Sequence, residues 1–368
     1  MSGAGGMRRS AGARGARGTR PAAGARGGRG ACLAAAALLV GLAGCGDPGA
    51  SAGGPYELKL AHVGAPGSLY DRTAAEFARR VAAESGGEIT VAVFGSSQLG
   101  DDETLLQKLK LGTVELALPS TVMSSTIDQF GLFEMPYLVA DREHMRRIEE
   151  RVVWPTLAPL AEARGYHILA VWENGFRHVT NDVRPIVGPE DLAGIKLRTP
   201  SGVWRVKLFQ ALGANPTPMA YSEVFMALQT GVMDGQENPL AQIWGARLHE
   251  VQDYLSLTGH VYTPAFLTTG VSRWGRLPED VRALVERVAR DMRPWVYETA
   301  AALDAELLAS LREEGTAVNE ADRARFLVAS RAVYDEFAAT VEGGAELLEG
   351  VRAAADDTGG AEEGSGAP

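Results

Sequence analysis

Two hydrophobic periodicities alternate through the middle of this chain. Residues 57–62 (ELKLAH) alternate apolar and polar side chains, as a half-buried strand does, and residues 68–84 space their apolar side chains at helical intervals. The same pair returns as residues 88–94 (EITVAVF), predicted to be a strand, and residues 102–111, predicted to be a helix. Strands that alternate with helices favour an α/β fold, in which helices cover the faces of a largely buried sheet.

The alternation continues further along the chain. Residues 115–118 and 168–172 are predicted to be strands, and residues 194–198 (GIKLR) another. A helix follows, with its N-cap near Ser201 and a glycine stop at Gly213. The length of the chain, 368 residues, suits two α/β domains that share a cleft.

The first 44 residues follow a different pattern. They carry seven arginines and no acidic residue, and an apolar run occupies residues 31–43. A membrane-spanning helix needs roughly 20 apolar residues, so this run is too short to be one. A basic segment followed by a short apolar run is typical of a secretory signal peptide, which we predict for residues 1–44.

Small residues directly precede a cysteine at the end of that run. The sequence Leu42-Ala43-Gly44-Cys45 resembles the lipobox of bacterial lipoproteins, in which the cysteine is diacylated and becomes the mature N-terminus. Two acyl chains are enough for stable membrane anchoring. We predict lipidation at Cys45; the alternative is an ordinary thiol beside a signal that is uncleaved or conventionally cleaved.

Both ends of the mature chain lack an apolar face to bury. Residues 45–55 are predicted to be the lipidated N-terminus and a flexible tether, and residues 351–368 a disordered tail. Two α/β domains are predicted between them: domain I over residues 56–173 with part of about 262–300, and domain II over residues 174–261 with part of about 301–350.

Composition and charge exclude several classes of function. Both cysteines, Cys32 and Cys45, lie in the signal or at its end, so the mature domains keep no thiol for catalysis, a metal or a disulfide. Without the seven signal arginines, 29 basic residues face 46 acidic ones, a formal charge of −17, which argues against nucleic acid as a partner. The six histidines show no paired-ligand spacing, and no G-x-G-x-x-G loop follows a strand. We therefore predict no enzymatic activity, no metal and no cofactor; a secreted hydrolase assembled from distant residues is the alternative.

One junction has the chemistry of an anion site. Arg198 ends the strand 194–198 just before the helix that starts near Ser201, and ligands of α/β folds bind at such strand ends. A guanidinium presents two parallel donors to a carboxylate, and the free N–H groups of a helix start add partial positive charge. The alternative for Arg198 is an internal salt bridge. A second arginine, Arg177, follows the strand 168–172, where the chain is predicted to cross between domains.

A third polar stretch lies further along the chain. Ser222 can cap a helix and Gly231 can end it. After that glycine we expect a turn that exposes Gln236, Glu237 and Asn238.

Three strings carry a resemblance to a known family: ENGFRHVTN (173–181), GIKLRTP (194–200) and GANPTPMAYSEVFMALQTGVMDGQENP (213–239). In this order and spacing they resemble the solute-binding proteins of TRAP (tripartite ATP-independent periplasmic) transporters, the DctP family, in lipoprotein form. The resemblance covers residues 56–350.

The resemblance implies a two-domain, periplasmic-binding-protein-like fold with a ligand cleft between the domains. Such a protein binds a small organic acid by its carboxylate and closes on it outside the cytoplasm, in the periplasm or at the cell surface. It then delivers the acid to the membrane subunits of a TRAP transporter. The alternatives are the solute-binding lipoprotein of an ATP-driven importer and a structural lipoprotein that has no cleft.

The resemblance also implies roles for particular residues. Arg198 pairs with the ligand carboxylate and Arg177 assists it. The other implied contacts are Tyr221, Asn238, His62 and Ser120. Trp172 is a candidate wall of the site by proximity alone. From the residues alone, Tyr221 could equally be a core aromatic, Asn238 the cap of a turn, and His62 a histidine buried against the sheet.

Overall fold

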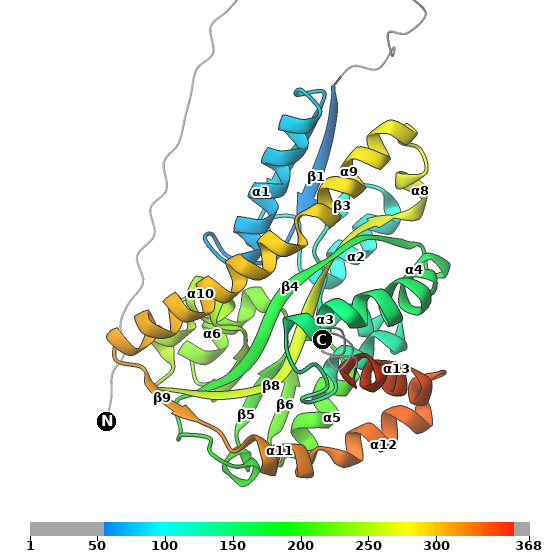
Figure 1. Ribbon diagram of the computed structural model, residues 1–368. Coiled ribbons are helices and arrows are strands. Elements are labelled where there is room, and N and C mark those ends of the chain that lie inside the picture. Colours follow the sequence, from blue (N-terminus) through cyan, green and yellow to red (C-terminus); the bar gives the residue numbers. More distant parts are fainter. Residues whose placement is uncertain (1–54, 357–368) are drawn as a thin grey trace, which may run out of the picture. The chain divides into compact units, whose positions relative to one another are not determined.

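The computed structural model describes residues 55–356, in which nine strands form one sheet (Figure 1). The strands follow the order β2-β1-β3-β8-β4-β7-β5-β6, and β9 pairs with β8 off this path. Their bounds are β1 (Tyr56–Ala61), β2 (Ile89–Phe94), β3 (Leu116–Ala117), β4 (Tyr166–Asn181), β5 (Lys196–Thr199), β6 (Asn215–Pro218), β7 (Gly235–Asn238), β8 (Tyr254–Gly270) and β9 (Ala317–Glu320). With the helices that pack on this sheet, the predicted α/β fold is confirmed.

Helices connect most of the strands. The α-helices are α1 (Leu69–Glu84), α2 (Asp102–Leu111), α3 (Arg142–Ile148), α4 (Ala158–Ala163), α5 (Val203–Ala211), α6 (Val224–Gln229), α7 (Leu240–Gly245), α8 (Val271–Trp274), α9 (Glu279–Asp291), α10 (Arg293–Glu313), α11 (Arg323–Ala329), α12 (Arg331–Thr340) and α13 (Gly344–Asp356). The 3₁₀ turns are η1 (Thr121–Ser125), η2 (Asp128–Glu134), η4 (Pro189–Leu192), η5 (Tyr221–Glu223) and η6 (Leu248–Val251), and η3 (Glu149–Leu157) is a π-helix.

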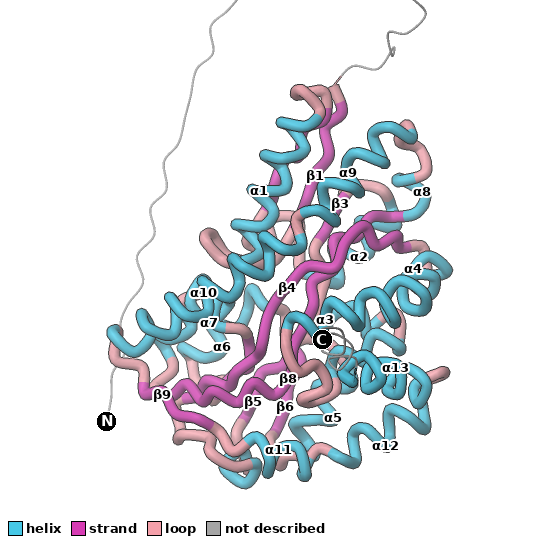
Figure 2. Tube along the Cα trace, in the orientation of Figure 1, coloured by secondary structure: helices cyan, strands magenta, loops and turns pink. Residues whose placement is uncertain are grey.

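Two long antiparallel strands, β4 and β8, run through the middle of the sheet and belong to both of its ends (Figure 2). β3 pairs with β8, and β1 and β2 extend the sheet from there. β7 pairs with the far part of β4, and β5 and β6 extend the sheet from that point. We call these the β1 end and the β5 end. The register between β4 and β8 shifts at three places, and such bulges bend and twist a strand pair.

The predicted domain boundaries at 173/174 and 261/262 fall inside β4 and β8, next to two of the three register shifts, and the two strands stay paired on both sides of these shifts. Helix α10 packs against α1 and α9 near the β1 end and against α7 near the β5 end. β4, β8 and α10 therefore each continue from one end of the sheet to the other. The assignment of residues to two domains remains a prediction.

Caps at the first helices explain why the sequence predicted them closely. The Ser68 side chain accepts a hydrogen bond from the N–H of Asp71 at the start of α1. Asp101 caps α2 in the same way, 2.8 Å from the N–H of Thr104, and Gly112 ends α2 in the left-handed conformation with φ 68°. These caps satisfy backbone groups that a helix end leaves free.

The polar stretch after α6 differs from the prediction. Gln236, Glu237 and Asn238 are not an exposed turn but strand β7, and their exposed fractions are 0%, 0% and 4%. The strand is buried because it pairs with both β4 and β5, and its side chains find partners there. The Gln236 amide, for example, donates to the hydroxyl of Thr180 on β4 at 2.8 Å.

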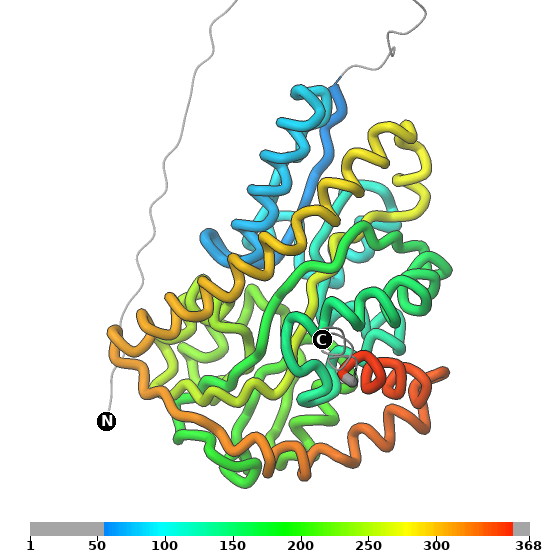
Figure 3. The backbone as a smooth tube through the Cα atoms, in the orientation of Figure 1, coloured from blue at the N-terminus to red at the C-terminus, as the bar shows by residue number. Residues whose placement is uncertain are grey.

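The C-terminal helices lie against distant parts of the chain, as the orange and red segments of Figure 3 show. Helix α13 packs against α3, η2 and η3, and its Val351 and Ala354 are fully buried. The predicted disordered tail is therefore wrong for residues 351–356, because small alanines suffice to face this core. Residues 357–368 lie outside the described residues, as do the predicted signal peptide, Cys45 and nearly all of the tether.

The hydrophobic core reaches across both ends of the sheet. A large cluster runs from Leu58 and Phe77 to Phe337, and a second one joins Leu69 of α1 to residues of α6, α7 and α10. Between residues 55 and 356, no helix has the length and apolar character to cross a membrane.

Candidate functional site

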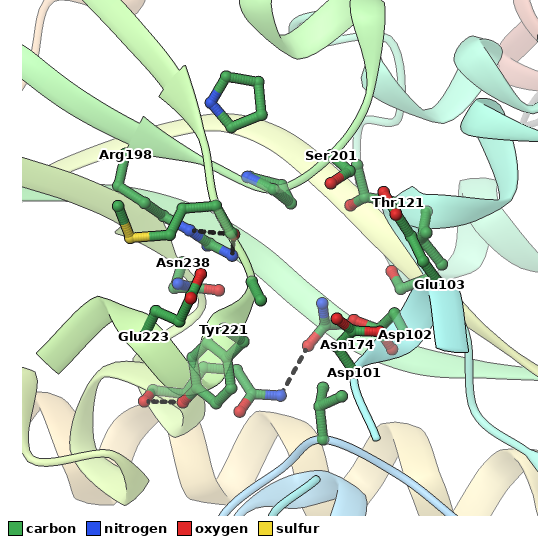
Figure 4. A pocket seen from close by; sticks show the side chains of 18 of the residues that line it. Asp101, Asp102, Glu103, Thr121, Asn174, Arg198, Ser201, Tyr221, Glu223 and Asn238 are labelled. Atoms are coloured by element: carbon green, nitrogen blue, oxygen red, sulfur yellow. Dashed lines mark hydrogen bonds between the residues drawn. The ribbon is translucent and has the colours of Figure 1, made fainter. Parts of the chain in front are cut away.

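A pocket of about 280 Å³ lies between the β1 end and the β5 end of the sheet (Figure 4). This volume is near the lower limit of small-molecule pockets, about 300 Å³. From the β1 end it is lined by Val63, Tyr70, Asp101, Asp102, Glu103, Ser120, Thr121 and Val122, and from β4 by Asn174 and Arg177. From the β5 end it is lined by Arg198, Pro200, Ser201, Pro218, Met219, Ala220, Tyr221, Glu223, Asn238 and Gln242.

Arg198 is buried at this pocket without a carboxylate partner. It is the last but one residue of β5, is 3% exposed, and its Nε and Nη2 donate to the carbonyl oxygen of Met219 at 3.0 and 2.5 Å. Among the described residues no acidic side chain pairs with it, so the internal salt bridge considered from the sequence is absent. Burial, and then the nearby charge of Arg177, lower the pKa of Arg198 to about 10. A buried guanidinium without a counter-charge is unfavourable, so this side of the pocket favours an anion.

Arg177 lies as deep but is paired within the protein. Its Nε and Nη2 donate to the two carboxylate oxygens of Glu237 at 2.5 and 2.9 Å, and Nη2 also donates to Asn238 Oδ1 at 3.0 Å. Glu237 further accepts from Arg205 Nη1 at 2.6 Å and contacts His260 Nε2 at 3.0 Å. We call Arg177, Arg205, Glu237 and His260 the Glu237 cluster. Although burial acts in the other direction, Arg177 and Arg205 hold the pKa of Glu237 well below its usual range.

A second carboxylate, from η2, meets this cluster at Arg205. Glu134 of η2 accepts from the backbone N–H of Arg205 at 3.0 Å and from the hydroxyl of Ser124. Burial raises the pKa of Glu134 to about 7, while Arg205 acts in the other direction. Arg205 Nε and Nη2 have no hydrogen-bond partner in the described part of the chain. Arg205 Nε nevertheless lies 3.9 Å from a Glu134 carboxylate oxygen. Because Glu134 is only partly ionised near pH 7, the three arginines Arg177, Arg198 and Arg205 outnumber the negative charges beside them.

Asn238, Tyr221 and Ser120 also line the pocket, as the sequence predicted for ligand contacts. Each already has a partner in the protein: Asn238 Nδ2 donates to Gln236 Oε1 at 2.5 Å, and the hydroxyl of Ser120 donates to Pro264 O at 2.6 Å. The Tyr221 hydroxyl donates to Gln242 O at 2.7 Å. These bonds fix the orientation of the three side chains at the pocket wall.

His62 and Trp172 do not line the pocket. Trp172 is 1% exposed, packs edge-on against Phe77, and its Nε1 donates to Ala289 O at 2.9 Å, so the prediction of a pocket wall is wrong. It points into the core because successive side chains of β4 face opposite sides of the sheet. His62 is fully buried against Tyr70, and burial lowers its pKa to about 4. This agrees with a histidine buried against the sheet, but neither ring nitrogen has a hydrogen-bond partner among the described residues.

Sequence reasoning missed the side of the pocket that faces Arg198. Asp102 and Glu103 begin α2, and Figure 4 shows them across the pocket from Arg198. Burial raises the pKa of Asp102 to about 7, with Arg198 acting in the other direction. The sequence marked these acids only as the first turn of a helix, where acidic residues are common. Within residues 55–356, no three His, Cys, Asp or Glu side chains gather as metal ligands.

Comparison with known proteins identifies relatives of this chain. The profile of bacterial extracellular solute-binding proteins, family 7, matches residues 60–340. The C4-dicarboxylate-binding periplasmic protein DctP of Rhodobacter capsulatus is 31% identical over 306 residues, which cover 82% of this chain and 91% of that protein.

Two solved structures resemble the fold over most of their length. A sugar acid binding protein from Advenella mimigardefordensis, in complex with galactonate, has a TM-score of 0.79 at 30% identity, covering 82% of this chain and 99% of that one. A TRAP periplasmic solute-binding protein from Sulfurospirillum deleyianum with bound succinate has a TM-score of 0.77 at 32% identity, with the same coverage.

Proposed function

Because this chain belongs to family 7 of the bacterial extracellular solute-binding proteins, we propose that it binds a small organic acid by its carboxylate at Arg198 and delivers it to a TRAP transporter. Proteins of this family are transport receptors that act outside the cytoplasm, so the chain is not an enzyme. The observation that carries the proposal is the buried guanidinium of Arg198, which faces the pocket and has no carboxylate partner among the described residues.

The carboxylate would complete the ion pair that Arg198 lacks. Two of the five guanidinium N–H groups are used by Met219 O, which leaves three for a ligand. The positive surplus of the Glu237 cluster, including Arg177, adds attraction without requiring that Arg177 release Glu237. Asn238 and Tyr221 border the same space and limit how the acid can lie.

Magnitudes agree with this role. A micromolar receptor needs about 8 kcal/mol of binding free energy. Removal of one partner from a buried, hydrogen-bonded charge pair costs roughly 2–5 kcal/mol. The pair between Arg198 and a carboxylate can therefore be the largest single contribution, and exclusion of water from the pocket strengthens it.

Arg198→Ala should abolish the binding of organic acids measured by titration calorimetry, because the pocket loses the cation that faces the ligand. Arg79→Ala is the matched control, since Arg79 pairs with Glu76 on the exposed face of α1, outside the residues that line the pocket. Circular dichroism and thermal unfolding check that both variants fold. Micromolar binding by the folded Arg198→Ala protein would refute the role of Arg198.

We further propose that a lipid anchor at Cys45 holds this receptor at a membrane. The proposal rests on the run of small residues before Cys45, and a tethered receptor would stay close to its membrane partners. Cys45→Ser should move the protein from the membrane fraction to the soluble one, as followed by fractionation and immunoblotting. Cys32→Ser, which changes a cysteine inside the signal, is the control and should leave the distribution unchanged. Continued membrane association of a processed Cys45→Ser protein would contradict the anchor.

A further inference from the structure

Two hydrogen-bonding groups that line the pocket have no partner in the described part of the chain, one in Gln242 from the β5 end and one in Thr121 from the β1 end. Gln242 is 4% exposed, and its Oε1 has no hydrogen-bond partner in the described residues. Its Nε2 donates to Asn174 Oδ1 at 3.3 Å, which orients the amide. The buried hydroxyl of Thr121 likewise has no partner. Both residues line the pocket, and a buried polar atom left without a partner is costly.

The charged residues that line the pocket from the β1 end are all acidic. Of the described residues that line the pocket, only Arg177 and Arg198 are basic. Asp101, Asp102 and Glu103 lie at the β1 end, and Glu223 lies at the β5 end with Arg198. Asp101 caps α2, and Asp102 and Glu103 follow it in the first turn. A ligand carboxylate at the β1 end of the pocket would meet like charges and find no guanidinium, which disfavours it.

Hydroxyl groups of a ligand can serve all of these side chains. Carboxylates and an amide oxygen accept hydrogen bonds from hydroxyls, and the Thr121 hydroxyl can donate or accept. We infer that the ligand is a monocarboxylate whose far end carries hydroxyl groups, with its carboxylate at Arg198 and its hydroxyls at Asp102, Thr121 and Gln242. This inference rests on the proposed function, because it requires that the carboxylate lie at Arg198.

A matched set of four-carbon acids tests the inference by titration calorimetry. The probes are 2,3,4-trihydroxybutanoate, succinate, butanoate and 4-aminobutanoate, and galactonate and hexanedioate repeat the comparison at six carbons. In the series that fits the pocket, the hydroxylated acid should bind at least about tenfold more tightly than the dicarboxylate, the plain acid or the amino acid. Tighter binding of a dicarboxylate, the plain acid or the amino acid would overturn the inference but leave the proposed function standing. No binding by any acid would overturn both.

Variants of Thr121 and Asp102 distinguish a role in recognising hydroxyl groups from a general loss of binding. Thr121→Val should weaken binding of the hydroxylated acid several-fold to about tenfold, while Thr121→Ser, which keeps the hydroxyl, should restore it. Above pH 7, where Asp102 is ionised, Asp102→Asn should reduce the preference for the hydroxylated acid over the dicarboxylate by about tenfold, because it removes a negative charge. Asp280→Asn makes the same change in the first turn of α9 and should leave the preference unchanged. Equal effects of Thr121→Val on all four probes would contradict a role in recognising hydroxyls.

Discussion

Arg177 and Arg198 are equally deep in the protein, on β4 and β5, yet their surroundings are opposite. Their exposed fractions are 2% and 3%. Arg177 meets the carboxylate of Glu237 with two hydrogen bonds, whereas Arg198 meets only the carbonyl oxygen of Met219. The same side chain at the same depth is thus part of the framework in one place and free to receive an anion in the other. The partner, and not the burial, makes the difference.

The largest loss of stability is expected when the ion pairs of Arg177 and Arg205 with Glu237 are removed. Glu237→Gln leaves Arg177 and Arg205 buried without their shared counter-charge. We expect the free energy of unfolding to fall by about 3–5 kcal/mol, as for other broken buried ion pairs, measured by urea denaturation. Glu223→Gln, at the pocket wall, is the control and should change it by less than about 0.5 kcal/mol. A loss below about 1 kcal/mol for Glu237→Gln would mean that the cluster is not structural.

The two arginines should respond differently to replacement by methionine in the ligand-free protein. Arg177→Met leaves Glu237 with fewer partners, and we expect a loss of about 2–4 kcal/mol in the free energy of unfolding. Arg198→Met removes a buried charge that has no acidic partner among the described residues, so stability should be unchanged or higher by up to about 2 kcal/mol. Equal losses in urea denaturation would remove the distinction between the two sites.

The smallest effect concerns pH and Glu134. Folding raises the pKa of Glu134 from 4.5 to about 7, so the folded protein holds this proton more tightly than the unfolded chain does. The resulting stabilisation is complete below about pH 4.5 and is lost as the pH rises through about 7.

Glu134→Gln keeps the side chain neutral at every pH. From pH 5 to pH 8 the unchanged protein should therefore lose about 1–3 kcal/mol more of its free energy of unfolding than the variant does, measured by urea denaturation at both pH values. Asp102 and Glu173 also have raised pKa values, so part of the pH dependence should remain in the variant. Identical pH dependence of the two proteins would show that Glu134 stays charged beside Arg205 when folded.

The sequence correctly predicted features that depend on residues close together in the chain. Asp101 and Gly112 mark the two ends of α2 through local hydrogen bonds, and the predicted helix 102–111 has the same bounds as the observed one. The place of Arg198 at a strand end facing a pocket also follows from its immediate neighbours and is confirmed as a position, while its role with a ligand is our proposal.

What the sequence did not predict depends on partners far along the chain. Gln236, Glu237 and Asn238 look like a turn because every side chain is polar, but their partners come from β4 and from Arg205. The acids of α2 were visible as a helix start, yet nothing local shows that this start faces Arg198 across the pocket. For the same reason, the unpaired Gln242 oxygen appears only when the fold brings its surroundings together.

The two long central strands limit how the polypeptide can be dissected. A chain cut at 173/174 or 261/262 would end within β4 or β8 and leave each fragment with half of a strand whose ladder of hydrogen bonds belongs to the other fragment. Such fragments would expose unpaired edges and invite aggregation. Neither predicted domain should therefore be produced alone; the two pieces would have to be expressed together. Tags or fluorescent reporters are best inserted in exposed turns like the one around Gly194.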